Sequence, residues 1–265
     1  MQARQLPFIQ GATWITQGYA LWRRNPALLT FASFSYLLIL VMISAVPLIG
    51  QPIASLLMPV LSLGVLNTCR AIDQGKRSGA DILFSGFRSN VPALLTVGGI
   101  YLIGSLLVLM LTLMFDGGTL MSLMNGETSR EAMQDANLLP SLTIALLLST
   151  PVIMAYWFAA VLVGWWEVNA PKAMFFSFVA CARNWRPFLA YGIVLGLVGG
   201  MLPGMVISTA QAIAPLLGTV ALLLIPLVLI PVVFASFYIN ARDVFALDQP
   251  DAHTVSLAKK DDGEA

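Results

Sequence analysis

The chain has 265 residues, of which 58% are hydrophobic and only 10% are charged, and its formal net charge is +1. A typical soluble domain carries about 25% charged residues. This composition therefore excludes a soluble globule, a nucleic-acid binder and a disordered protein, and it predicts an integral membrane protein.

Four long segments of the chain contain no charged residue. They lie at positions 25–69, 89–115, 136–166 and 187–241. A helix rises about 1.5 Å per residue and must cross roughly 30 Å of hydrocarbon, so one span takes about 20 apolar residues. The second and third segments should hold one span each, and the longer first and last segments should each fold back once and hold two.

The expected fold is therefore all-α, with six transmembrane helices, because a chain in lipid has to satisfy its own backbone hydrogen bonds. Proline and glycine favour turns within the two longer segments, at 47–52 and near 203–215. The predicted spans lie near 27–46, 53–69, 91–115, 138–165, 187–207 and 216–240. Residues 1–247 would form one membrane domain, and residues 248–265 a charged cytoplasmic tail that we expect to be disordered.

Lysine and arginine are distributed unevenly across the predicted membrane. Of the 14 such residues, only Arg130 falls on one side, and all the others fall on the opposite side. Cytoplasmic loops carry an excess of Lys and Arg. The pattern therefore predicts that both termini lie in the cytoplasm and that the loop 116–137 lies outside.

The first, third and fifth predicted spans begin with a similar motif of arginine, asparagine and proline. Asparagine is a good N-cap, and proline is tolerated in the first helical turn because its missing N–H would be unpaired there. The pattern indicates three helical hairpins that enter and leave on the cytoplasmic side; ordinary helix-start preference is the alternative. The motif residues are Arg24, Asn25 and Pro26, then Arg88, Asn90 and Pro92, then Arg183, Asn184 and Pro187.

An amphipathic segment precedes each of these entry motifs. In the first, apolar residues recur at steps of four and three, which places them in one stripe along a helix, opposite Gln10 and Gln17. The stripe consists of Phe8, Ala12, Ile15, Tyr19 and Trp22. Shorter stretches lie at 82–87 and 174–181. We expect short helices in the cytoplasmic headgroup layer; docking against a cytoplasmic partner is the alternative.

Glycines at four-residue intervals mark the fifth predicted span, at Gly192, Gly196, Gly200 and Gly204. Small residues let two helices approach closely in lipid, where packing replaces the hydrophobic effect as the driving force. The stripe predicts packing against another helix of the same chain. A contact between two copies of the chain and a lining for a lipid or substrate path are the alternatives.

The sequence offers no recognisable chemistry. It contains no phosphate-binding loop, no nucleophile elbow, no zinc-binding H-E-x-x-H helix and no C-x-x-C pair. The single histidine, His253, lies in the tail, and Cys69 and Cys181 lack metal-ligand spacing. No predicted span carries an ionisable residue in its core, which disfavours ion-coupled transport. We therefore predict no catalytic, cofactor or metal site and no enzyme.

Several segments resemble an uncharacterised family of small proteobacterial multipass inner-membrane proteins. They are P-L-I-G at 47–50, C-R-A-I-D-Q-G at 69–75, L-F-S-G-F-R at 83–88, A-C-A-R-N-W-R-P-F at 180–188 and I-N-A-R-D-V-F at 239–245. More loosely, the three-hairpin plan is similar to the membrane domain attached to some bacterial glycerophosphodiester phosphodiesterases, although the enzymatic domain is not in this chain. The resemblance implies a membrane topology and no particular activity.

Two functions remain open from the sequence. The first is a non-enzymatic membrane protein that works through contacts with the lipid bilayer, with a membrane-protein partner or with a second copy of itself. The amphipathic segments and the glycine stripe favour it. The second is a small permease or channel for a neutral or apolar solute, which the repeated hairpins and the proline-interrupted spans favour.

Overall fold

The computed structural model describes residues 3–124 and 138–246. Within these residues the chain forms helices and no strand, and six helices are long and apolar enough to cross a membrane. These spans are Pro26–Ser44, Gly50–Asp73, Val91–Asp116, Leu139–Trp166, Trp185–Ile213 and Pro215–Phe245. The all-α fold with six spans is confirmed. The loop predicted to lie outside at 116–137 falls mostly outside the described residues, and so does the tail at 248–265.

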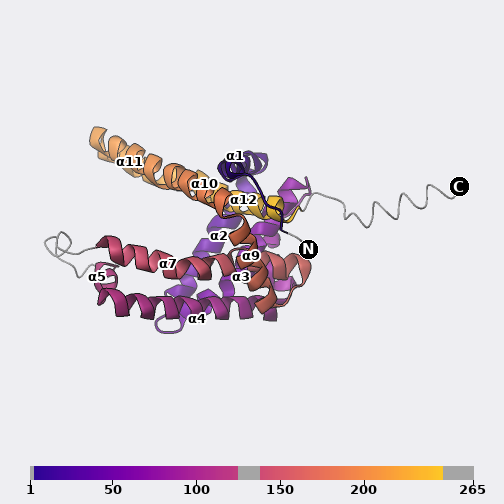
Figure 1. The fold of residues 1–265 in the computed structure, drawn as a ribbon. Helices are drawn as coiled ribbons and strands as arrows, with labels where there is room; N and C mark the ends of the chain where they lie inside the picture. The colour runs from indigo at the N-terminus through magenta and orange to yellow at the C-terminus, as the bar shows by residue number, and fades with distance from the viewer. Residues whose placement is uncertain (1–2, 125–137, 247–265) are drawn as a thin grey trace.

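Thirteen helical elements occur in the described residues (Figure 1). In chain order they are α1 (Phe8–Arg24), α2 (Pro26–Ser44), α3 (Gly50–Asp73), η1 (Ala80–Arg88), α4 (Val91–Asp116), α5 (Thr119–Met124), α7 (Leu138–Trp157), α8 (Ala159–Trp166), α9 (Ala170–Arg183), α10 (Trp185–Gly196), η2 (Leu197–Met201), α11 (Leu202–Ile213) and α12 (Pro215–Phe245). Helices α10 and α11 diverge from α4 and α7 in Figure 1.

The spans are less regular than the sequence suggests. The fourth is broken between α7 and α8, where the backbone N–H of Phe158 donates to Ser177 Oγ, 2.8 Å away, instead of to its own helix. The fifth passes through one π-helical turn, η2. Pro203 lies inside α11 and not in a turn, so the second reversal is confined to Ala214, whose backbone is extended. The expected turn region at 203–215 was therefore too wide.

Helix α3 occupies the centre of the bundle. It packs against α2, α4, η1, α8 and α12. Of the 18 residues in its most apolar stretch, 56% are buried. In the corresponding stretch of the fifth span, Trp185–Ile213, no residue is buried. In lipid such unburied apolar surface needs no protein cover, because the acyl chains are as apolar as the side chains. The fifth span is therefore the most peripheral of the six.

One end of the molecule, which we call the basic end, gathers the arginines at the span termini. Arg24 and Arg242 both reach Asp73, and Arg70 lies over the ring of Trp165, 5.0 Å from its centroid. The short elements α1, η1 and α9 pack at this end, where buried side chains such as Trp14 and Tyr238 also concentrate. Much of the buried core of the described residues therefore lies at the basic end.

Helix α1 packs closely against α10 and α12. A Cβ atom on Gly11 would collide with the backbone carbonyl of Pro187, and one on Gly18 would lie 2.7 Å from the backbone nitrogen of Ser236. Its packed face carries Gly11, Trp14, Gly18 and Leu21, and therefore lies beside the apolar stripe predicted from the sequence. Of that stripe only Ile15 is buried, while Phe8 and Tyr19 stay 50% and 45% exposed.

Candidate functional site: polar network and pockets at the basic end

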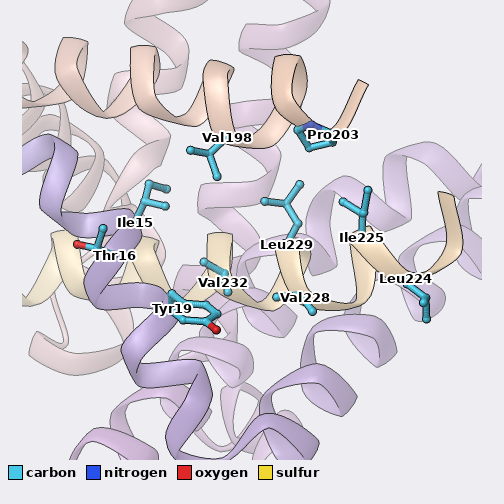
Figure 2. A pocket seen from close by; sticks show the side chains of 10 residues that line it. All are labelled: Ile15, Thr16, Tyr19, Val198, Pro203, Leu224, Ile225, Val228, Leu229 and Val232. Carbon is cyan, nitrogen blue, oxygen red and sulfur yellow. The ribbon is translucent and has the colours of Figure 1, made fainter. Parts of the chain in front are cut away.

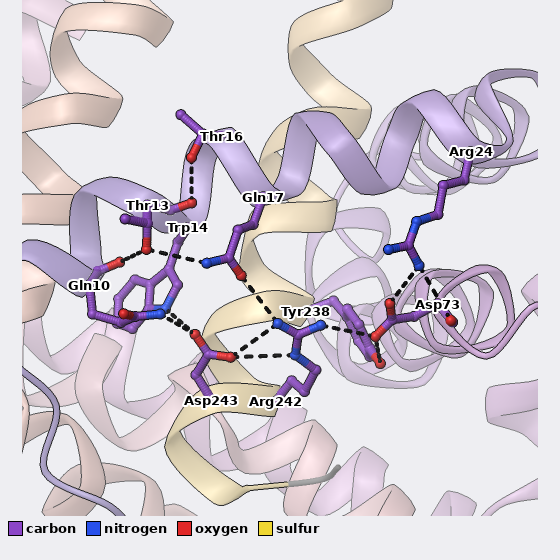
Figure 3. A network of polar contacts seen from close by, with 10 residues as sticks. All are labelled: Gln10, Thr13, Trp14, Thr16, Gln17, Arg24, Asp73, Tyr238, Arg242 and Asp243. Carbon is purple, nitrogen blue, oxygen red and sulfur yellow. Dashed lines mark hydrogen bonds and ion pairs between the residues drawn. The ribbon is translucent and has the colours of Figure 1, made fainter.

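Asp73, at the end of α3, is the centre of a polar network (Figure 3). Its Oδ1 accepts a hydrogen bond from Arg24 Nη1 at 3.0 Å. Its Oδ2 accepts from Arg242 Nη1 at 3.1 Å and from the Tyr238 hydroxyl at 3.0 Å. Only 12% of the Asp73 side chain is exposed, so its charge depends on these donors for solvation. The carboxylate thus connects α1, α3 and α12.

A second carboxylate, Asp243, extends the network along α12. Its Oδ2 accepts from Gln10 Nε2 at 2.7 Å and from Trp14 Nε1 at 3.0 Å. The Arg242 guanidinium lies between the two acids and also donates to Gln17 Oε1 at 3.1 Å. The polar face of α1 therefore points into the protein at these positions. The network joins α1 to the last span.

Sequence reasoning missed both carboxylates as network members. It used the arginines of this end only as a topological signal, and the positive-inside rule gives acidic residues little weight. A signal was nevertheless present, since Asp73 and Asp243 each follow an arginine closely at the end of a predicted span. An acid beside an arginine where a span meets the interface indicates a paired charge.

The three entry motifs are not structurally equivalent. Asn25 and Asn90 cap their helices, because their Oδ1 atoms accept from the backbone N–H of Leu28 and Ala93. Asn184 does not cap α10: its Oδ1 accepts from the backbone of Leu6. Its Nδ2 donates to two backbone carbonyls, those of Arg4 and Ala180. The cap prediction is therefore wrong at Asn184, which instead anchors the N-terminal segment.

The remaining motif residues also differ between the copies. Pro26, Pro92 and Pro187 all lie in the first turn of their helices, α2, α4 and α10, as predicted, but of the three only Pro187 is buried, beneath Gly11 of α1. Arg24 joins the network. Arg88 makes only a long ion pair with Asp81, with Nη2 and Oδ2 3.8 Å apart and both side chains largely exposed. Arg183, in the last turn of α9, completes the predicted set.

The glycine stripe makes no contact of the kind expected within the chain. A Cβ atom built on Gly192, Gly196, Gly200 or Gly204 meets no atom of the described residues within 4 Å. The close approaches occur at other glycines, among them Gly11, Gly64 and Gly86, each of which faces a backbone carbonyl. The expectation of intrachain packing at the stripe is therefore wrong. A contact with a second copy, or a lining for a path, stays a prediction.

An apolar groove runs between α1 and the hairpin of the last two spans (Figure 2). It has a volume of about 590 Å³, and Ile15 and Tyr19 of α1 face Val198 of η2 and Leu229 of α12 across it. Thr16 and Tyr19 supply the only side-chain oxygens among its lining residues. Such a groove suits an acyl chain better than a polar molecule.

A smaller cavity of about 210 Å³ lies in the middle of the bundle. Tyr191, in its wall, shares a 2.8 Å hydrogen bond with Ser236. Tyr156 Oη and Trp157 Nε1, from two other wall residues, are buried and have no hydrogen-bond partner among the described residues. Half of the lining residues are aromatic: Tyr36, Tyr156, Trp157, Tyr191, Phe234 and Phe237. The lining fits a small, neutral molecule.

A polar pocket opens where the α1–α2 junction meets the end of α3. Its volume is about 610 Å³. Three of its lining residues are cationic, Arg24, Lys76 and Arg77, and one is acidic, Asp73. We call it the basic pocket. Among the pockets described above it has by far the most polar lining, so it is a candidate for a charged ligand.

The described residues offer no metal site and no reactive thiol. No group of three or more His, Cys, Asp or Glu side chains lies close enough together to hold a metal ion in the part of the chain that the structure covers. Cys69 and Cys181 are both buried and free. Burial raises the pKa of the Cys181 thiol to about 12, although a hydrogen bond with Ser177 opposes the shift. Cys181 therefore stays a thiol at neutral pH.

Comparisons with known proteins place the chain in a family. No family model and no solved structure matches it. It is 36% identical over 265 residues to the probable inner membrane protein BTH_II0599 of Burkholderia thailandensis, and the match covers 95% of this chain and 97% of that relative. The six apolar helices agree with the relative's description. The chain is a multipass inner-membrane protein and belongs to the family of this probable inner membrane protein.

Proposed function

We propose that this protein is a non-enzymatic component of the inner membrane that works through contacts with lipids of the cytoplasmic leaflet. The observation that carries the proposal is that all three short elements at the basic end leave aromatic rings uncovered. Apolar rings of this kind suit an interfacial element, whose apolar face is buried at the boundary between the headgroups and the acyl chains. The exposed rings are Phe8 and Tyr19 of α1, Phe84 and Phe87 of η1, and Phe175 and Phe176 of α9.

Each of the three elements has a second face that packs on the chain. Gly11 and Gly18 hold α1 against α10 and α12, and Gly86 brings η1 against the backbone of Val60. Ala173 and Ser177 of α9 are fully buried. Fixed on one face and apolar on another, these elements suit the plane of the headgroups. Their arginine-rich surroundings agree with a cytoplasmic basic end and cytoplasmic termini.

Spin labels at two exposed rings test this placement. The variants Phe84→Cys and Phe175→Cys can be labelled selectively, because the natural cysteines are buried. In proteoliposomes both labels should collide mainly with oxygen, which dissolves in lipid. A label on Gly79→Cys, in the exposed loop before η1, should collide mainly with a water-soluble nickel chelate. Collision with the nickel chelate at all three positions would contradict the lipid contact. Protection of the labels at 84 and 175 from both oxygen and the nickel chelate would indicate a protein partner.

A small permease for a neutral solute is the second candidate, and the central aromatic cavity favours it. Two unpartnered donors in the wall, Tyr156 Oη and Trp157 Nε1, could bind a solute with a hydrogen-bond acceptor. Proteoliposomes mixed rapidly with glycerol or urea would test this by light scattering. Swelling faster than in protein-free vesicles would support transport, and equal rates would contradict it. The looser likeness to the membrane domain of glycerophosphodiester phosphodiesterases adds no activity to either candidate.

A further inference from the structure

We propose that the basic pocket binds the phosphate group of an anionic phospholipid. This inference rests on the proposed function and gives it a ligand class. The pocket lies where α1 ends, α2 begins and α3 ends, so it sits at the level at which two spans leave the hydrocarbon. Lipid phosphates lie at this level of a bilayer, and basic pockets between spans on the cytoplasmic side bind anionic headgroups.

The charges of the pocket favour an anion. Lys76 and Arg77 are exposed, and neither makes a side-chain hydrogen bond or ion pair with the described residues. The one acid in the wall, Asp73, uses both carboxylate oxygens to accept bonds from Arg24, Arg242 and Tyr238. Its charge is therefore already compensated. The cations outweigh the acid, and two of them are available to a ligand.

A free hydrogen-bond donor lies in the same wall. The Ser78 Oγ is buried and has no partner among the described residues. A buried polar atom without a partner is unfavourable, and a phosphate oxygen is a strong acceptor that would satisfy it. The unpartnered Ser78 hydroxyl therefore supports the presence of a ligand in this pocket, independently of the charges.

The backbone holds these side chains in place. Gly75 has a left-handed φ of 65°, which favours glycine. Its N–H donates to Ile72, and the N–H of Lys76 donates to Ala71, which is the Schellman pattern that ends a helix. This turn redirects the chain at the end of α3 and places Lys76, Arg77 and Ser78 in one wall of the pocket. The backbone that carries Lys76 and Arg77 is therefore held in place by this turn.

General attraction between a basic surface and anionic lipid is the competing explanation, and a matched pair of variants separates it. The test variant is Lys76→Gln with Arg77→Gln. The control is Lys172→Gln with Arg186→Gln, which removes the same charge from exposed positions at the basic end but outside the pocket. Each protein is reconstituted with equimolar phosphatidylglycerol and phosphatidylcholine, extracted, and analysed by native mass spectrometry for retained lipid.

The wild type should retain phosphatidylglycerol in preference to phosphatidylcholine. In the pocket variant this preference should fall about tenfold, because each charge-assisted hydrogen bond to the phosphate contributes strongly to lipid binding. The control should keep it. Ser78→Ala should lose a smaller part, about threefold, since it removes one neutral donor. Equal losses in the pocket variant and the control, or no preference in the wild type, would overturn the proposal.

Inorganic phosphate distinguishes a lipid from a free anion as the source of the phosphate group. If an excess of phosphate leaves phosphatidylglycerol bound, the lipid source is supported. If it displaces phosphatidylglycerol from the wild type, the lipid source is overturned in favour of a soluble phosphate. The spin-label experiment reads a different property. Labels at positions 84 and 175 can lie in lipid while the pocket shows no preference, so the two failures are distinguishable.

Discussion

Asp73 and Arg242 stand 169 positions apart in the chain and form an ion pair in which Oδ2 and Nη1 are 3.1 Å apart. The pair joins the second span to the sixth. With side chains only 12% and 20% exposed, both charges have exchanged most of their water for protein donors and acceptors. Breaking such a pair leaves one partly buried charge without its counterpart, which costs more than the pair contributes.

The first prediction concerns this pair. Asp73→Asn should lower the free energy of unfolding by about 2 kcal/mol, since Arg24 and Arg242 lose a charged acceptor. Asp81→Asn is the control, because the Asp81–Arg88 contact is long and exposed and should contribute about 0–1 kcal/mol. Thermal melting in detergent measures both. Similar melting temperatures for the two variants would show that the network does not stabilise the fold.

Glycine substitutions should have opposite effects on α1 and on the fifth span. Gly11→Ala places a methyl group against the Pro187 carbonyl and should destabilise by about 1–3 kcal/mol. Gly196→Ala meets open space and should be neutral or stabilising by up to about 1 kcal/mol, because alanine is the better helix former. Melting temperatures check both, and a harmful Gly196→Ala would indicate a contact outside the described chain.

The copy-to-copy alternative for the glycine stripe can be tested separately. If two copies meet there, Gly196→Leu with Gly200→Leu should shift the size-exclusion mass towards a folded monomer, because leucine fills the space that the second helix needs. An unchanged mass and melting temperature would leave the stripe facing lipid alone.

Two tyrosines beside the central cavity should respond in opposite directions to removal of the hydroxyl. Tyr156→Phe removes a buried hydroxyl without a described partner and should stabilise by about 1 kcal/mol. Tyr191→Phe removes the hydrogen bond with Ser236 and should destabilise by a similar amount, about 1 kcal/mol. A destabilised Tyr156→Phe protein would mean that the hydroxyl has a ligand or water partner in the membrane.

Cys181 should resist maleimide in the folded protein. Its raised pKa of about 12 keeps the thiol protonated across the working range, and only the thiolate reacts. Labelling should therefore stay negligible as the pH rises from about 7 to about 9, and should become complete after denaturation in dodecyl sulfate. An introduced cysteine at Gly79 supplies the reactive control. Equal labelling rates in the native state would show that the α7–α9 contact opens.

Topology reporters test the orientation of the membrane domain. Fusions at three positions should report the outer side: Gln51, Asn125 and Gln211. Fusions at three others should report the cytoplasm: Gly79, Ala173 and Asp251. Asn125 and Asp251 lie outside the described residues. A cytoplasmic signal at Asn125 would overturn the whole topology assignment.

The spans were predictable because each residue that lies in hydrocarbon has to be apolar, and this property can be seen in the sequence alone. A charge-free run has to be long enough to cross the bilayer. The caps at Asn25 and Asn90 were predictable too, because each asparagine bonds to a backbone N–H only three positions further along the chain. The contacts that organise the basic end are of another kind. Asn184 resembles a cap locally, but it bonds to Leu6 and Arg4, which the fold brings to it from about 180 positions away.

The glycines show the same limit. Four of them at regular spacing suggested a packing face, yet the backbone approaches lie at glycines without that spacing, such as Gly64 against Leu83. Spacing shows which residues share a helix face and leaves open which face another helix covers. In a membrane protein hydrophobicity does not show which face another helix covers, because the lipid-facing and the covered faces are equally apolar.

The wide turn at Leu197–Met201 changes what the fifth span can offer to a neighbour. A π turn accommodates one residue more than an α turn, so it rotates everything after it by roughly 100° relative to a continuous α-helix. Gly192 and Gly196 precede this offset, whereas Gly204 follows it. Residues four apart advance about 40° around an α-helix, so Gly204 would lie about 120° from Gly192 without the offset and lies only about 20° from it with the offset. The π turn therefore returns Gly204 to nearly the same side of the span as Gly192, and a straight helix from a second molecule could follow the glycines from one end of the stripe to the other.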